Sequence, residues 1–194
     1  MSIEFGPTLR RLLAEPRVPE LGSGRPDRKK QSELEKLIPE AIRESGAIEN
    51  RDLGRACEAG LWLHFDFLEE AHQISQQIDS PEGSYWHGVM HRREGDFANA
   101  SYWFRRAGNL PFFPELGQAA AQQLSSTTVH PLLARIVRGE NWDPQRFVDL
   151  CKACIGGKLA IEETCRNLQR LEWDHLFNYC YRGAINPSLP KQES

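Results

Sequence analysis

The chain has 194 residues, of which 40% are hydrophobic and 26% charged, a composition typical of one globular domain large enough to bury a core. Its formal net charge of −3 argues against a nucleic-acid partner, which normally requires a basic domain or stripe. The sequence contains no apolar run of the roughly 18 residues that span a membrane, and its start has no apolar segment typical of a secretory signal. We therefore expect a cytoplasmic protein without a nucleic-acid or membrane partner.

Cysteine usage agrees with a reducing compartment. The five cysteines are odd in number and mostly lie beside apolar residues in predicted helices, which is typical of packed thiols. Cys151 and Cys154 have the spacing of a zinc-binding pair, which Cys165, His175 and Cys180 would complete. Because the pair falls inside a predicted helix rather than a turn, buried thiols are favoured over a zinc site.

Proline and glycine are concentrated near the start of the chain. Residues 1–31 are therefore expected to form an extended arm that wraps the surface, apart from a turn of helix at 8–14. Residues 32–183 are expected to form one domain, and residues 184–194 a flexible tail.

Apolar residues between the arm and the tail recur with the period of a helix, and proline and glycine separate the periodic segments. No alternation with the period of a strand extends over any length. The sequence therefore predicts a single all-α domain of about seven or eight helices. Nine periodic segments contribute to these helices, at 32–42, 51–63, 66–78, 81–94, 97–107, 114–124, 129–138, 144–155 and 158–182.

The segment 84–108 has small and aromatic residues at the spacing of a helical hairpin. Gly88 and Ala100 allow two antiparallel backbones to approach closely, while Phe97, Phe104 and Ala107 fill the seam between them. This pattern resembles a tetratricopeptide hairpin, here a single one within a non-repetitive helical domain.

Three polar residues of the first hairpin helix share one face. His87, His91 and Glu94 lie at positions i, i+4 and i+7, so their side chains stack above one another. Imidazoles four residues apart on a helix can converge on one metal ion, and His72 on the preceding helix is placed to provide a third ligand. The other interpretation of the same pattern is histidines that form ordinary hydrogen bonds within the fold.

A second row on the same helix is formed by Tyr85, Val89 and Arg92, with Arg93 beside it. The tetratricopeptide resemblance implies that this row lines a groove for an extended peptide, in which the basic residues favour an acidic chain end. The row would make the protein an adaptor.

The same hairpin is also expected to offer a small-molecule pocket. Trp86 or Trp103 would provide a stacking wall, an arginine such as Arg106 would bind a carboxylate or phosphate, and His91 would donate or accept a proton. The candidate ligand-binding residues of the hairpin and its neighbour are His72, Tyr85, Trp86, Arg92, Arg93, Tyr102, Trp103 and Arg106.

The sequence therefore favours a protein-binding or small-ligand-binding module that uses the hairpin at 85–106, with an acidic peptide or small anion as partner. The alternative is a small hydrolase, lyase or isomerase, metal-dependent or of the acid/base type, in which His87, His91 and Glu94 are catalytic. A divalent metal at His87 and His91, joined by His72, is the only cofactor that the pattern indicates. Exposed tryptophans on the long C-terminal helix would indicate a homodimer.

Overall fold

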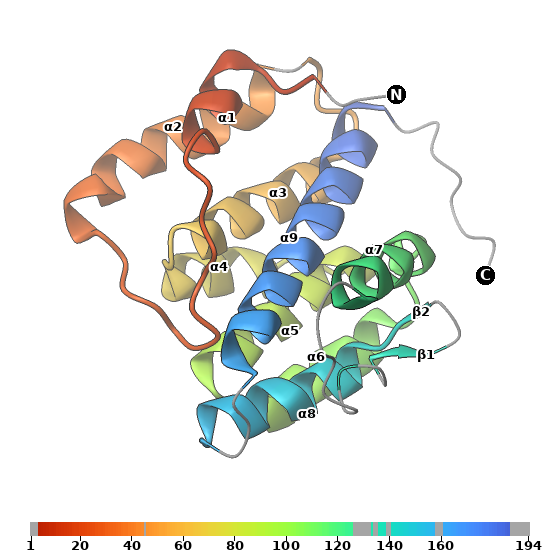
Figure 1. The fold of residues 1–194 in the computed structure, drawn as a ribbon. Helices are drawn as coiled ribbons and strands as arrows, with labels where there is room; N and C mark the ends of the chain where they lie inside the picture. Colours follow the sequence, from red (N-terminus) through yellow and green to blue (C-terminus); the bar gives the residue numbers. More distant parts are fainter. Residues whose placement is uncertain are drawn as a thin grey trace.

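A computed structural model describes residues 4–44, 46–125, 133, 136–138, 141–157 and 161–186. Within these residues the fold is all-α, as the sequence predicts (Figure 1). The helices are α1 (Pro7–Leu12), α2 (Gln31–Arg43), α3 (Arg51–His64), α4 (Leu68–Ser75), α5 (Pro81–Glu94), α6 (Phe97–Ala107), α7 (Phe113–Ser125), α8 (Pro144–Ile155) and α9 (Glu162–Ile185). A short 3-10 turn, η1 (Arg28–Lys30), precedes α2.

One predicted helix differs from the structure. Of the segment 129–138, residues 129–132 and 134–135 lie outside the described residues, and its end forms a strand instead of a helix. This strand, β1 (Val137–Arg138), pairs antiparallel with β2 (Asn141–Trp142), so that Val137 faces Trp142. A two-residue strand is too short to produce a recognisable alternation in the sequence.

Local signals set both ends of α5. The side chain of Ser80 accepts a hydrogen bond from the backbone N–H of Gly83 at 3.3 Å, and Pro81 occupies the first helical position, where its missing N–H is not needed. Gly95 ends the helix with φ of +90°, in the left-handed region that glycine adopts without strain. The next helix then begins at once, with the side chain of Asp96 as its cap.

Helices α5 and α6 pack closely as a hairpin. A Cβ atom on Gly88 would lie 2.9 Å from two carbons of the Phe104 ring, so this face of α5 has room only for glycine. Ala100 is fully buried, and the Phe104 ring meets the Tyr85 ring edge-on at 4.8 Å between centroids. The small and aromatic residues of the pattern therefore make the contact that their spacing predicts.

Helix α9 runs through the middle of the molecule and packs against α3, α7 and α8 (Figure 1). Its Trp173 stacks on Phe177 and donates a hydrogen bond from Nε1 to the carbonyl oxygen of Gly60 on α3 at 2.7 Å. Trp173 is buried, so this helix does not meet the condition of an exposed tryptophan that would have indicated a homodimer. No helix in the described part of the chain, α9 included, combines the length and the apolarity needed to cross a membrane.

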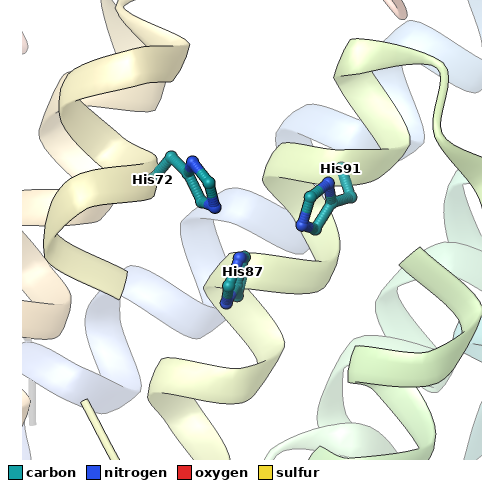
Figure 2. Close-up of side chains that lie close together, drawn as sticks. All are labelled: His72, His87 and His91. Carbon is teal, nitrogen blue, oxygen red and sulfur yellow. The ribbon is translucent and has the colours of Figure 1, made fainter. Parts of the chain in front are cut away.

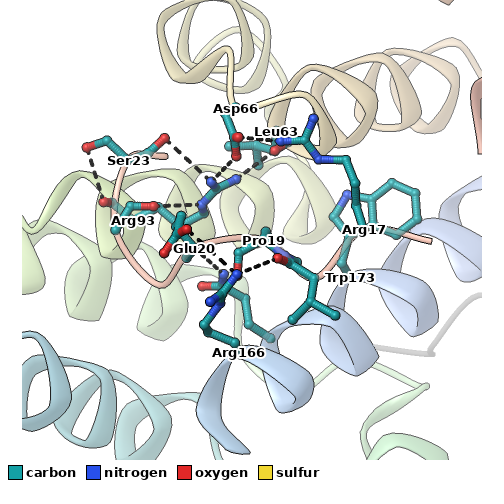
Figure 3. Close-up of polar contacts among 12 residues, drawn as sticks. Arg17, Pro19, Glu20, Ser23, Leu63, Asp66, Arg93, Arg166 and Trp173 are labelled. Atoms are coloured by element: carbon teal, nitrogen blue, oxygen red, sulfur yellow. Dashed lines mark hydrogen bonds and ion pairs between the residues drawn. The ribbon is translucent and has the colours of Figure 1, made fainter. Parts of the chain in front are cut away.

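The N-terminal arm lies along α9 between α1 and η1 (Figure 1). Side chains of α9 hold its main chain. Arg166 donates to the carbonyl oxygen of Pro19 at 3.1 Å (Figure 3). Gln169 donates to the carbonyl oxygen of Glu20 at 2.8 Å. Leu21 is buried in the core. The arm is therefore docked on α9 by hydrogen bonds to its backbone.

Candidate metal centre

Three histidines converge between α4 and α5 (Figure 2). His72 projects from α4, whereas His87 and His91 project from successive turns of α5. The ring centroids lie 4.8 Å apart for His72 and His87, 5.4 Å apart for His72 and His91, and 4.8 Å apart for His87 and His91. One nitrogen from each ring lies within 4.8 Å of the other two. The spacing along α5 and the choice of His72 as third member are as the sequence predicts.

His87 is the most enclosed of the three. Its side chain is 3% exposed, and one face of its ring stacks on Trp103 at 4.0 Å between centroids. Neither Nδ1 nor Nε2 has a hydrogen-bond partner in the described part of the chain. A buried polar atom without a partner costs about 1–3 kcal/mol, so an unsatisfied imidazole in this position needs an explanation.

His91 is oriented by Glu94, which lies one turn further along α5. The Nδ1 atom of His91 is 3.2 Å from the Oε2 atom of Glu94. Because a carboxylate accepts hydrogen bonds, this contact places the ring proton on Nδ1 and leaves Nε2 with its lone pair. Glu94 thus has the position of a carboxylate that orients a metal-binding histidine.

The surroundings keep the rings of His87 and His91 neutral. Burial, together with the neighbouring rings of His91 and His72, lowers the pKa of His87 to about 3. Burial also lowers the pKa of His91, although the hydrogen bond and charge of Glu94 oppose that shift. A neutral imidazole is the form that donates a lone pair to a metal ion.

The second row of α5 does not line a groove, which corrects the sequence-based expectation. Arg92 is fully buried and forms an ion pair with Glu172 of α9, with 2.5 Å between Nη2 and Oε2. Tyr85 is also fully buried and donates a hydrogen bond to the same carboxylate at 2.8 Å. Val89 is buried as well. The contacts of Arg92 and Tyr85 join α5 to α9. Because all three side chains are buried, the row does not form a surface that could bind a peptide.

Arg93 and Trp86 are likewise parts of the fold. Arg93 is 3% exposed and binds the carboxylate of Asp66 at 2.5 Å and the carbonyl oxygen of Leu63 at 2.6 Å (Figure 3). Trp86 is fully buried, and its ring lies so close to Gly60 that a Cβ atom there would be 2.7 Å away. Neither side chain is placed as a wall or an anion contact of an open pocket, in contrast to the expectation.

The residues of α6 that were expected to bind a ligand are more exposed than those of α5. Tyr102 is 50% exposed, and Arg106 pairs with Asp79 at 2.5 Å while its guanidinium lies 5.3 Å from the centre of the Trp103 ring. Trp103 therefore contacts both His87 and Arg106. Of the stacking residues that the sequence suggested, Trp103 is the one that the structure places beside the histidines.

The cysteines do not assemble a metal site. Cys154 and Cys165 lie 3.7 Å apart between their Sγ atoms, and burial raises the pKa of both thiols. The ring of His175 contacts the backbone carbonyl of Leu171 instead. Among the residues that the structure describes, the three histidines are the only such group of His, Cys, Asp or Glu close enough to share an ion.

Comparisons with protein-family models, with curated proteins and with solved structures found no match for this chain. The functional interpretation therefore rests on the geometry and chemistry of the histidine cluster itself.

Proposed function

We propose that this protein binds a divalent transition-metal ion of the zinc class through His72, His87 and His91. The observation that carries the proposal is the enclosed ring of His87, whose two nitrogens have no partner although the ring lies beside two further imidazoles. A metal ion would satisfy one of these nitrogens and would draw the three rings to a common point.

The donor set favours particular ions. Imidazole nitrogens suit zinc, copper, nickel and cobalt, whereas magnesium and calcium prefer oxygen ligands. With metal–nitrogen distances near 2.0–2.1 Å, tetrahedral ligands lie about 3.3 Å from one another. The nitrogens lie within 4.8 Å of one another, so rotations of the side chains would have to bring them closer to complete the site.

The number of ligands leaves room for a fourth group. Three protein ligands and one open position are typical of catalytic zinc, which is the feature that favours the alternative of a small metal-dependent enzyme. Three cavities lined by described residues include none of the three histidines. The proposal is therefore metal binding by the hairpin and α4, and a substrate pocket is not part of it.

Titration of metal-free protein with zinc tests the proposal. Wild-type protein is expected to bind one ion per chain, measured by calorimetry and by metal analysis after dialysis, and His87→Ala is expected to abolish this binding. His175→Ala is the matched control, because this histidine of α9 contacts a backbone carbonyl and is not part of the cluster. Equal binding by wild type and His87→Ala would contradict the proposal.

Glu94 provides a second and finer prediction. Glu94→Gln is expected to weaken zinc binding about 10–100-fold without changing the stoichiometry, because an amide orients the His91 ring less strongly than a carboxylate. Competition with a coloured chelator measures the change. Glu69→Gln, an exposed carboxylate on α4 that contacts Gln73, is the control for a general loss of negative charge. A similar weakening in both variants would show that Glu94 does not act through His91.

A further inference from the structure

A second candidate site lies at the C-terminal end of α3. It is enclosed by the N-terminal arm, α2 and the last turn of α3. A cavity of about 300 Å³ opens there, which is the lower end of the range of roughly 300–1,000 Å³ for small-ligand pockets. Its apolar lining comes from Leu34 and Leu37 of α2 and from Phe65 and Phe67 after α3. None of its lining residues belongs to the metal centre. The cavity therefore has the size and the apolar wall of an independent binding site.

His64, which also lines this cavity, has an unsatisfied nitrogen. The residue is 4% exposed, and its Nε2 atom has no hydrogen-bond partner in the described part of the chain. Its ring is held between Phe65, edge-on at 4.9 Å between centroids, and Trp173 at 5.1 Å. A ligand that accepts or donates a hydrogen bond at Nε2 would remove the penalty of leaving this atom unpaired.

The charges around His64 favour an anion at this inner end. Burial lowers the pKa of His64 to about 3, with further contributions from the nearby cations of Arg170, Arg17 and Arg93. Asp66 pairs with both Arg17 and Arg93 (Figure 3), and Asp174 pairs with Arg170. Around the neutral ring of His64, the three guanidinium groups are thus paired with only two carboxylates. One positive charge is therefore left without a counter-charge.

The mouth of the cavity carries both signs of charge. Arg11 and Lys30 line it together with Glu15, Asp27 and Glu33, and all five residues are exposed. Solvent screens charges at such positions far more than it screens groups beside the buried ring. The inner end therefore determines the charge of the ligand.

We propose that this cavity binds a small organic carboxylate, whose apolar body packs on Leu34, Leu37 and the two phenylalanines while its carboxylate accepts a hydrogen bond from Nε2–H of His64. Arg17 lines the same cavity, and its charge acts on His64. A single surplus charge and an apolar wall fit a monoanion with a hydrophobic body better than a phosphate.

Pairs of acids and their neutral amides test the charge. Phenylacetate with phenylacetamide, and hexanoate with hexanamide, are titrated against full-length protein by calorimetry and by nitrogen-15 NMR of the histidine rings. A chelator is present throughout, because a carboxylate would also coordinate a metal ion at the other site. At least one acid is expected to bind about 10-fold more tightly than its amide and to shift the His64 signals, since a hydrogen bond to a charged group is stronger than a neutral one.

A matched pair of variants tests the position. His64→Phe keeps an aromatic ring but removes Nε2, and it is expected to reduce the affinity for the acid to that for the amide. His175→Phe, a change of the same kind on α9, is expected to leave binding unchanged. The proposal is overturned if acid and amide bind equally, or if neither acid binds wild-type protein at millimolar concentration.

Discussion

Glu172→Ala is expected to lower the free energy of unfolding by about 3–5 kcal/mol, because it leaves the buried cation of Arg92 without its counter-ion. Both side chains are fully buried in the wild type, and Arg92 donates hydrogen bonds to both oxygens of this carboxylate. Burial alone would lower the pKa of Arg92, but Glu172 raises it above the ordinary value, so Arg92 remains charged in the core. Tyr85 loses its acceptor in the same variant.

Urea denaturation, followed by tryptophan fluorescence and circular dichroism, measures this loss. Asp174→Ala is the control on the same helix, because its partner Arg170 is part-exposed and such a pair contributes at most about 1 kcal/mol. Replacing both members of the buried pair, as in Arg92→Met with Glu172→Leu, is expected to restore most of the stability. A loss of under 1 kcal/mol in Glu172→Ala would show that Arg92 finds another partner or reaches water.

The histidine cluster could be predicted because its geometry is mostly local. His87 and His91 are four residues apart on one helix, so their rings share a face whatever surrounds the helix. His72 comes from the helix that precedes α5 in the chain, and consecutive helices usually pack together. Capping signals such as Ser80, Pro81 and Gly95 likewise depend only on neighbouring residues, and these limits of α5 are confirmed.

The fate of the second row on α5 could not be predicted in the same way. Helix α5 contacts α3, α4 and α6, and Arg92 also binds α9, so α5 is enclosed on most sides and both of its polar rows are largely buried. Its hydrophobic pattern therefore does not distinguish a core face from a solvent face. The partner of Arg92 is Glu172, which lies 80 residues later, and no local pattern connects the two.

The way in which the arm docks on α9 also could not be predicted from the sequence. Arg166 and Gln169 recognise carbonyl oxygens of the arm rather than its side chains. Backbone carbonyls are present at every residue, so the sequence of the arm contains no signal for these contacts. In the segment between α1 and η1, Leu21 is the apolar residue whose burial marks the docked conformation.

Acid is expected to destabilise the fold partly through His64. Its pKa is about 3 in the folded protein, whereas an imidazole in an unfolded chain has a pKa near 6.5. Between these values the unfolded chain takes up a proton that the folded state does not, so the contribution of His64 is present above pH 6.5 and is lost as the pH falls toward 3. A pKa shift of this size corresponds to a loss of roughly 3–5 kcal/mol in the free energy of unfolding over the whole pH interval.

The measurement that isolates His64 is the stability of wild type and His64→Leu across this pH interval, in the presence of a chelator so that metal binding does not contribute. His87 has a similarly low pKa and contributes to both curves, so the difference between the curves reports His64. His64→Leu is expected to lose less stability with acid than wild type does. Phe65→Leu, which alters the packing against the same ring but removes no titratable group, is expected to lower stability equally at every pH. Parallel curves for wild type and His64→Leu would mean that His64 is protonated in the folded protein, with its charge balanced by Asp66 or reached by water.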